Sequence, residues 1–131
     1  MERLALDRGR AVIRDAHHRY LLLQEAEGPS KGTWTFPGGR VDPNEDMEHA
    51  VIRETKEETG FDIRIIKKIG SFSSSEIGHK FQTHIFEAIV ISGELSPPVD
   101  EIMNAQWLSA AEIESMASIL KGSYVLEAIK I

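Results

Sequence analysis

The sequence contains no cysteine among its 131 residues. Disulfides, cysteine-ligated zinc and thiol catalysis are therefore excluded, and this usage fits a cytoplasmic protein. No apolar run approaches the ~20 residues that span a bilayer. The segment Met1–Arg10 has no apolar centre of the kind found in signal peptides. We therefore expect a protein that is not exported and has no membrane partner.

Positively charged residues are the minority among the charged ones. Fifteen Lys and Arg stand against 21 Asp and Glu, for a formal net charge of −6. An acidic protein is a poor match for a nucleic-acid polymer, because neutralising phosphates with Lys and Arg supplies most non-specific affinity. A small phosphorylated ligand is still compatible with this charge, since metal ions bound by acidic residues reverse the local field.

What is present is typical of one globular domain. Hydrophobic residues make up 41% and charged residues 27% of the chain, and no repeat or linker divides it, so a single domain over residues 1–131 is predicted. Strands are predicted at 10–14 and 20–24, on either side of a polar turn, and at 33–36, 62–72, 80–91 and 106–108. A short helix is predicted at 109–116, with Ser109 as its cap. Residues 123–131 fit helix and strand equally. The order predicts an α/β domain with helices packed on a mixed sheet.

Residues typical of helix ends mark the start and the end of one long helix at about 43–59. Asp42 is suited to cap it, Pro43 to occupy its first position, and Glu45 stands in a capping-box relation to Asp42. Gly60 is placed to end the helix in a left-handed conformation. The helix is therefore defined at both ends by residues whose conformational preferences fit those positions.

Three glutamates share the inward side of this helix. On a wheel at 100° per residue, Glu54, Glu57 and Glu58 fall at roughly −20°, −80° and +20° from Met47, in line with the apolar stripe. Like-charge pairs at this spacing cost about 0.2–0.5 kcal/mol each even when exposed. Partial burial raises that cost unless a cation compensates it. Oxygen ligands at this density favour Mg²⁺ or Mn²⁺ over zinc. The alternative is an ordinary solvent-facing charged surface.

The residues around these glutamates form a longer motif. In residues 39–61, Gly39 and Glu45 precede the run RETKEETGF, with five and seven residues in the two intervals. This segment resembles the Nudix box, and the lead-in WTFPGG at 34–39 also resembles members of this MutT-like family. Every charged and glycine position of the box is present. Thr55 stands where the family usually has a bulky aliphatic residue, a departure that concerns packing rather than chemistry.

The resemblance implies both a fold and a chemistry. The fold is an α/β/α sandwich, and the activity is metal-dependent hydrolysis of a diphosphate bond in a nucleotide-like substrate. Glu54, Glu57 and Glu58 are implied to hold Mg²⁺ or Mn²⁺, together with a backbone carbonyl near Gly38. Arg53 is implied to orient a glutamate by a charge-assisted hydrogen bond. Glu54 or Glu57 is the predicted base that takes a proton from the attacking water.

Other candidates lie outside these glutamates. Family members often add a carboxylate from elsewhere to the metal site, and Glu101 is predicted in that role, with a plain surface glutamate as the alternative. Gly39 lets the backbone approach a substrate closely. Lys80, with His79, is predicted to contact substrate phosphates. Glu45 serves either as a cap or in the site. Five aromatic residues are candidates for stacking on a nucleobase or, alternatively, for the core: Trp34, Phe36, Phe72, Phe81 and Phe86.

Within the family, a nucleoside triphosphate pyrophosphohydrolase is the first hypothesis, because the chain has the size of a minimal domain. Dinucleoside polyphosphates, ADP-ribose, nucleotide sugars and capped RNA ends are alternative substrates. Ile77, Gly78 and His79 stand where the ADP-ribose and dinucleoside-polyphosphate branches often have a proline or tyrosine. A non-catalytic sensor module is a hypothesis of another class, but such a module is expected to lose the Glu57–Glu58 pair. A homodimer is compatible with the sequence.

Overall fold

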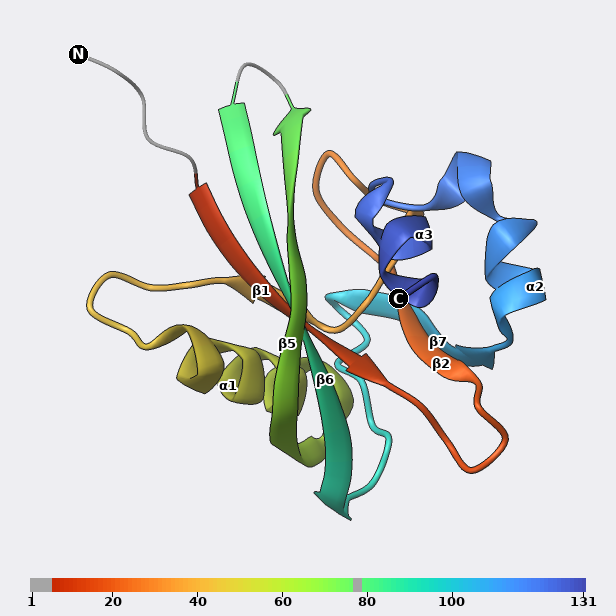
Figure 1. Cartoon of the computed structure of the whole chain (residues 1–131). Coiled ribbons are helices and arrows are strands. Elements are labelled where there is room, and N and C mark those ends of the chain that lie inside the picture. Colours follow the sequence, from red (N-terminus) through yellow and green to blue (C-terminus); the bar gives the residue numbers. More distant parts are fainter. Residues whose placement is uncertain (1–5, 77–78) are drawn as a thin grey trace.

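The computed structural model describes residues 6–76 and 79–131 (Figure 1). The strands are β1 (Leu6–Ile13), β2 (Tyr20–Glu25), β3 (Trp34–Thr35), β4 (Gly38–Arg40), β5 (Phe61–Glu76), β6 (His79–Gly93) and β7 (Ile102–Leu108). The helices are α1 (Met47–Thr59), α2 (Ala110–Glu114) and α3 (Tyr124–Ile129), with a 3-10 turn η1 at Ala117–Ile119. No helix within these two described ranges is long and apolar enough to cross a membrane.

The larger sheet has four strands in the order β4–β1–β6–β5. β1 and β6 run parallel, from Leu6 opposite Phe81 to Ile13 opposite Ala88, whereas β4 and β5 pair antiparallel with their neighbours. A parallel pair requires a long connection between its strands, and here that connection contains α1 and the strands from β2 to β5. α1 packs against this sheet (Figure 1), so the predicted mixed sheet flanked by helices is confirmed.

A second, smaller sheet has the order β3–β2–β7 and is antiparallel. The strands predicted on either side of the polar turn at 15–19 are both present as β1 and β2. They nevertheless belong to different sheets and share only an isolated bridge between Arg14 and Tyr20. The turn therefore carries the chain from one sheet to the other, and this change of sheet was not predicted.

The core has two parts, one on each side of β1 and β2. Successive side chains of a strand point to opposite faces. Accordingly, Ile13 packs with Val51 of α1 in one cluster, while the neighbouring Val12 packs with Ile113 of α2 and Val125 of α3 in the other. Both strands are therefore buried on both faces. This arrangement gives the α/β/α layers that the sequence predicted, with α1 on one side and α2 and α3 on the other (Figure 1).

The start of α1 differs from the prediction. The helix begins at Met47 rather than near Pro43, and its N-cap is Asp46, which makes no side-chain cap hydrogen bond. The reason is local: Asn44 has a φ of 67°, a left-handed conformation that cannot continue a helix. Residues 42–45 form a separate turn instead. The end is as predicted, because Gly60 has a φ of 85° and donates its N–H to the Lys56 carbonyl.

The remaining elements differ from the predictions in both directions: β5, β6 and β7 are longer, β3 and α2 are shorter, and β4 was not predicted. β5 and β6 extend the strands predicted at 62–72 and 80–91 into a long hairpin, and β7 begins four residues before its predicted start. α2 is capped by Ser109 in a complete capping box, as predicted. The ambiguous segment 123–131 is helical, as α3, because its buried side chains complete the second core cluster.

Candidate functional site

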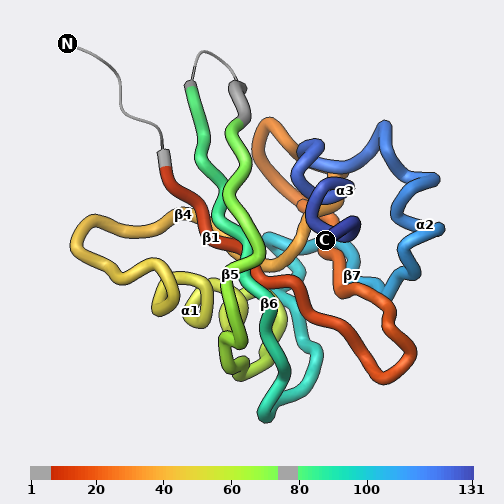
Figure 2. Tube along the Cα trace, viewed as in Figure 1, coloured from red at the N-terminus to blue at the C-terminus, as the bar shows by residue number. Residues whose placement is uncertain are grey.

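The site begins with a tight loop between β1 and α1. Gly38 and Gly39 open β4, which lies against β1 and close to α1 (Figure 2). Gly38 has a φ of 144°, and a Cβ there would overlap the Gly9 carbonyl oxygen. A Cβ on Gly39 would come within 3.0 Å of the Glu54 carboxyl carbon. Glycine is therefore required at Gly38, whereas a Cβ on Gly39 would press against the flexible end of the Glu54 side chain.

Glu58 lies deepest of the glutamates on α1. The Gly38 backbone N–H donates a hydrogen bond of 2.8 Å to its Oε1. Burial is the main cause that raises the pKa of Glu58 to about 8, and the charges of Glu54 and Glu25 act in the same direction. The Gly38 hydrogen bond and the positive charge of Arg10 act in the opposite direction on this pKa. The fold thus holds a carboxyl group where its anion is poorly solvated.

Glu54 lies next to Glu58 and faces the same loop. Its side chain is partly buried, and burial raises its pKa above the ordinary value. Arg53 partly offsets this effect, because its Nη1 donates to Glu54 Oε1 at 3.1 Å. We call Glu54 and Glu58 the inner pair. The two carboxyl groups have raised pKa values for the same reason, which is loss of water.

Arg53 also belongs to a second group of charges farther out. Its Nε and Nη2 donate to the two carboxylate oxygens of Glu45 at 2.7 and 2.8 Å, which is a bidentate pair. This hydrogen bonding lowers the pKa of Glu45 to about 2. Asp42 and His49 also contact this pair, at 3.4 Å from Arg53 and 2.9 Å from Glu45. We call Asp42, Glu45, His49 and Arg53 the outer network.

Glu45 therefore acts differently from the predicted cap of the long helix. Its Oε1 does accept the Asp42 N–H at 3.1 Å, as a capping box would require, but both residues precede α1. Its principal partner is Arg53. Arg53 in turn contacts Glu54, so its predicted role of orienting a glutamate fits the observed hydrogen bonds to both carboxylates.

Glu57 is the most exposed of the three predicted metal ligands. Its side chain is 55% exposed and lies 3.4 Å from Arg53 Nη1. Within residues 6–76 and 79–131, no three acidic or histidine side chains converge closely enough to hold a metal ion as they stand. The donor types nevertheless fit a hard divalent cation, because Glu54 and Glu58 are carboxylates whose negative charge lacks solvation. The metal-binding roles of these glutamates remain predictions.

A cavity of about 550 Å³ lies beside β4, and none of the described residues that line it is a glutamate of α1. Its wall includes Arg40, which follows Gly39 on β4, and Glu25, whose charge acts on Glu58. On one side Arg8 lies over the Phe81 ring at 4.5 Å. Its other lining residues are Glu27, Gly28, Pro29, Ser30, Glu101, Ile102 and Lys121. The cavity thus combines an aromatic surface with charged groups of both signs.

Two of the predicted residues, Phe81 and Glu101, line this cavity. Phe81 lines it, whereas Trp34, Phe36 and Phe86 are core residues and Phe72 is partly buried against the second cluster. Glu101 is an exposed residue of the cavity wall, with its backbone carbonyl accepting from Ala26 N–H. Lys80 is exposed and does not line the cavity. The His79 side chain and residues 77 and 78 lie outside what the structure describes.

Three residues of this region were missed in the sequence. Arg10 is buried on β1, Glu25 ends β2, and Lys121 donates to Glu25 at 2.7 Å. A signal existed for Glu25, which is a charged residue at the end of the largely apolar β2, whereas Arg10 follows Asp7 and Arg8 on a strand of mixed polarity. No signal existed for Lys121. It reaches Glu25 because Leu120 bridges Trp34, a contact between distant parts of the chain.

The sequence matches a known family over nearly its whole length. A family model described as "NUDIX domain" matches residues 7–126. The chain is 32% identical over 108 residues to the ADP-ribose pyrophosphatase of Methanocaldococcus jannaschii, covering 80% of this chain and 63% of that protein. It is 34% identical over 97 residues to the oxidized purine nucleoside triphosphate hydrolase of Danio rerio, covering 72% and 61%. The chain thus spans less than two thirds of both relatives.

Solved structures share the complete fold. The MutT protein from Methanosarcina mazei Go1 has a TM-score of 0.86 at 26% identity, covering 99% of this chain and 94% of that one. A Nudix hydrolase from Nitrosomonas europaea has a TM-score of 0.86 at 25% identity, covering 97% and 87%. The two sheets and their flanking helices are therefore an arrangement already known from proteins of this kind.

Proposed function

The chain belongs to the Nudix family, and we propose that it is a pyrophosphohydrolase that splits a diphosphate bond of a nucleoside triphosphate. The observation that carries this proposal is the inner pair. Glu54 and Glu58 are held against the Gly38–Gly39 loop with raised pKa values, at a cost to the fold that a purely structural surface would not require. A bound cation would compensate the negative charge of the two carboxylates, and a polyphosphate would in turn bind that cation.

A divalent cation fits these carboxylates and supplies, when bound, positive charge for phosphate oxygens and acidification of water. Glu54, Glu57 and Glu58 are the residues that would hold it. Glu54 is favoured over Glu57 as the base, because Glu54 is partly buried against the Gly39 backbone whereas the Glu57 side chain is 55% exposed. Arg53 fixes Glu54 through the hydrogen bond at 3.1 Å. Water then attacks one phosphorus, its P–O bond to the leaving diphosphate breaks, and Glu54 takes the proton.

The cavity is the proposed site of the nucleoside. Its volume of about 550 Å³ is within the range of small-molecule sites. Phe81 offers a ring on which a base can stack, a contact that contributes roughly 1–3 kcal/mol. Arg8 and Arg40 are positive charges beside the loop that leads to the inner pair. A base in the cavity would therefore leave its phosphates directed toward the glutamates.

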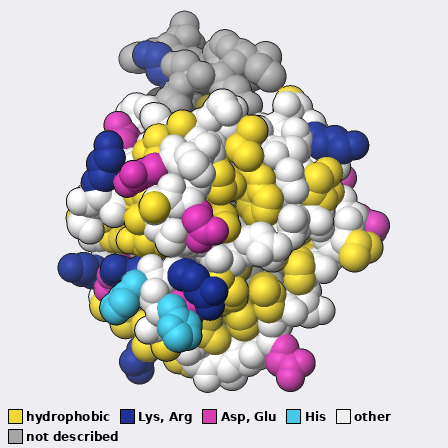
Figure 3. Space-filling model, turned by 90° about the vertical axis from the view of Figure 1, so that its right-hand side faces the viewer, with side chains coloured by type: hydrophobic (Ala, Val, Ile, Leu, Met, Phe, Trp, Pro, Cys, Tyr) yellow, Lys and Arg dark blue, Asp and Glu magenta, His cyan; other side chains and the backbone are white. Residues whose placement is uncertain are grey.

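A small nucleotide is favoured over a nucleic-acid polymer. The net charge is −6, and the face that carries α2 and α3 mixes hydrophobic, acidic and basic side chains (Figure 3). Among the described residues visible on that face, the basic side chains form no continuous patch of the kind that tracks a phosphate backbone. The zebrafish relative named for oxidized purine nucleoside triphosphates supports the choice of triphosphates. The archaeal relative named for ADP-ribose supports the alternative.

A substrate screen tests the proposal. The protein is incubated with Mg²⁺ or Mn²⁺ and with ordinary and oxidised nucleoside triphosphates, ADP-ribose, nucleotide sugars and dinucleoside polyphosphates. We expect the highest kcat/KM on a triphosphate, with pyrophosphate and a nucleoside monophosphate as products. Highest kcat/KM on ADP-ribose would replace the proposed substrate. Binding of nucleotides without turnover of any would instead favour a sensor module.

A matched pair of variants tests the role of the box. Glu57→Gln removes one charge from the predicted metal ligands and is expected to reduce kcat by roughly 10³-fold or more, with the fold intact. Glu48→Gln removes the same charge from the exposed first turn of α1 and should leave kcat unchanged. Near wild-type turnover by Glu57→Gln on the best substrate would defeat the assignment.

A further inference from the structure

Arg10 is a buried cation whose guanidinium is held mainly by backbone carbonyls. It is 2% exposed on β1, yet within the described residues no carboxylate forms an ion pair with it. Its Nε is buried and has no hydrogen-bond partner in that part of the chain. Removing an arginine from water in this way is costly unless its charge serves nearby groups. The groups around the guanidinium must therefore account for the burial of its charge.

The guanidinium lies between a loop and a ring. Its Nη1 donates to the Phe36 carbonyl at 2.9 Å and lies 3.5 Å from the Gly38 carbonyl. On the other side is the ring of Tyr124, 5.7 Å from the guanidinium carbon, and the hydroxyl of that tyrosine bonds Thr35 at 2.6 Å. Arg10 therefore holds the loop 36–38 from inside the protein and is itself held in place by α3.

The Gly38 residue connects Arg10 to the inner pair. Its carbonyl faces Arg10, and its N–H donates to Glu58 at 2.8 Å. The backbone of β1 strengthens this connection, because Ala11 N–H donates to the Pro37 carbonyl at 2.8 Å. Displacement of the loop by even a few tenths of an ångström would change the hydrogen bond to Glu58.

We propose that Arg10 is a positioning residue that fixes the Gly38 peptide, and through it the Glu58 carboxylate. This explains why a full positive charge is buried on β1 directly before the apolar residues Ala11, Val12 and Ile13. The charge of Arg10 also favours the anion of Glu58 without bonding to it, which leaves the Glu58 oxygens available to a ligand. Only the kinetic part of this inference rests on the proposed hydrolase function.

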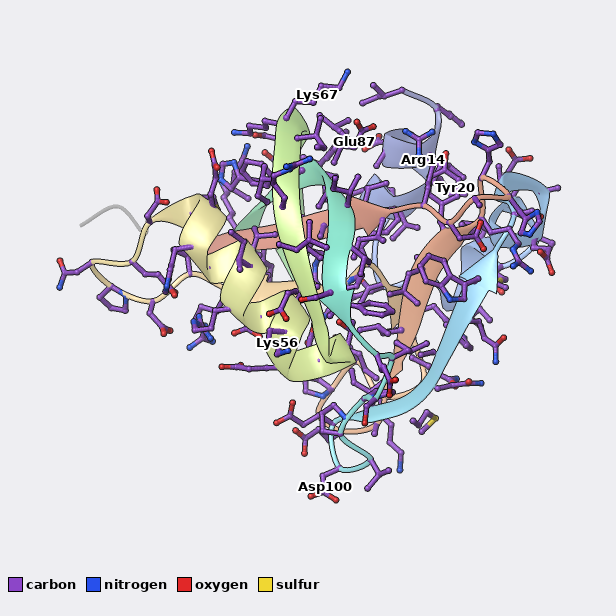
Figure 4. All side chains as sticks on the ribbon, turned by 90° about the horizontal axis from the view of Figure 1, so that it is seen from below. Arg14, Tyr20, Lys56, Lys67, Glu87 and Asp100 are labelled. Carbon is purple, nitrogen blue, oxygen red and sulfur yellow. The ribbon has the colours of Figure 1, made fainter. Side chains whose placement is uncertain are left out.

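Arg14 provides a matched control four residues along the chain. Its Nη2 donates to Glu87 at 2.7 Å and its guanidinium lies over the Tyr20 ring at 5.6 Å, so it has a tyrosine partner as Arg10 does. Its side chain is 41% exposed. Arg14, Tyr20 and Glu87 lie together on the side of the molecule away from α1 (Figure 4). A change at Arg14 should therefore affect the sheet but not the Gly38 loop.

The experiment compares Arg10→Lys with Arg14→Lys in the full chain. Lysine keeps the charge but loses the planar fork that reaches the loop carbonyls. Amide hydrogen exchange is measured by NMR without metal, at Gly38 and at core amides of β1 and β6. We expect Arg10→Lys to reduce protection of Gly38 by at least about 10-fold more than protection of the core. Arg14→Lys should leave the ratio unchanged.

Kinetics form the second readout. On the best substrate, Arg10→Lys is expected to lower kcat by about 10–100-fold, the range found for groups that orient metal ligands, with little change in KM. Unchanged Gly38 protection in Arg10→Lys, or an equal loss at every amide, would overturn the positioning role. If the exchange result holds but no substrate is hydrolysed, the proposed function fails and the positioning role stands.

A second variant covers failure of Arg10→Lys to fold. Tyr124→Leu removes the ring that holds the guanidinium on its far side while leaving Arg10 in place. Protection at Gly38 should then fall more than protection at the core amides. Tyr124→Phe keeps the ring and serves as its control. Equal behaviour of the leucine and phenylalanine variants at Gly38 would contradict the proposal.

Discussion

The inner pair and the outer network place the same kind of side chain in opposite situations. Glu58 lies near the end of α1, where burial raises its pKa to about 8. Glu45 precedes α1, is paired with Arg53 and has a pKa of about 2. In the outer network the anion is stabilised by the fold. In the inner pair the fold works against the anion. The comparison indicates that the outer network organises α1 and that the inner pair is retained for a ligand.

The largest expected difference between the two regions is in activity. Glu58→Gln keeps the shape of the side chain and its ability to accept the Gly38 N–H, but removes the charge. Mutating a group that only hydrogen-bonds to a metal ligand typically lowers activity about 10–100-fold. Loss of a ligand itself should therefore lower kcat/KM by more than about 100-fold. Steady-state kinetics on the best substrate measure it. Similar activity in Glu58→Gln and the exposed Glu48→Gln would remove the distinction between the regions.

The next effect is on the free energy of unfolding as the pH rises from about 4.5 to 8. Because the pKa of Glu58 is raised from 4.5 to about 8 in the folded state, the unfolded chain ionises this group first as pH rises. Without metal, the free energy of unfolding should therefore fall between about pH 4.5 and pH 8 and level off above that range. One pKa unit corresponds to about 1.4 kcal/mol, so the fall is on the order of a few kcal/mol at most.

Urea unfolding in EDTA across this pH range measures that fall in wild type and in Glu58→Gln. The variant has no ionisable group at the position and should be less sensitive to pH. Adding Mg²⁺ should restore stability to the wild type above pH 8 and much less to the variant. Parallel pH dependences in the two proteins would show that Glu58 is not the group responsible.

A smaller effect comes from Thr55, the one departure of the motif from its family pattern. Thr55 is fully buried on α1, and its hydroxyl has no hydrogen-bond partner within the described residues. Thr55→Val should increase the free energy of unfolding by about 1 kcal/mol, because an unsatisfied buried hydroxyl is replaced by a methyl group. Kinetic constants should not change, since Thr55 contacts neither region's carboxylates.

Thr59 is the matched control for that substitution. It is equally buried, but its hydroxyl donates to the Thr55 carbonyl at 2.7 Å and accepts the Phe61 N–H at 3.0 Å. Thr59→Val should therefore reduce the free energy of unfolding by about 1 kcal/mol, the opposite sign. Chemical denaturation of both variants decides the matter. Two changes of the same sign would mean that the hydroxyl contacts do not determine stability here.

The smallest expected effect lies in the outer network at acid pH. The lowered pKa of Glu45 means that its stabilising contribution is complete above about pH 4.5 and is lost as pH falls toward about 2. Glu45→Gln should therefore unfold at a higher pH than the wild type during acid titration. Far-UV circular dichroism follows that titration. An unchanged acid midpoint would indicate that the Glu45–Arg53 pair contributes nothing to stability.

The features that could be predicted are those that depend on local spacing. Helical periodicity alone places Glu54 and Glu58 on the apolar side of α1, and Gly60 ends the helix because few other residues adopt its conformation. The predicted start of α1 was wrong, because the left-handed conformation of Asn44 separates the turn at Asp42 from the helix. Nothing in the spacing distinguishes this turn from a first helical turn.

The depth of the site could not be predicted, because it depends on contacts between distant segments. Burial of Glu58 requires the Gly38 loop, and that loop is held by Arg10 from a different strand. The cavity takes Phe81 from β6 and Lys121 from the segment before α3. The strands other than β4 could be recognised from their composition. β4 was not predicted, and the division of the strands between two sheets is a property of the whole chain.

The parallel pairing of β1 with β6 also has a consequence for the order of assembly. Residues 6–13 cannot form this parallel pair until residues 81–88 are available, whereas their antiparallel pairing with β4 needs only residues 38–40. Pairings between segments as distant as β1 and β6 form slowly. Arg10 and Gly9, which receive the Gly38 loop, both lie on β1. During synthesis, therefore, the cavity can be completed only after β6, which carries Phe81, has emerged from the ribosome.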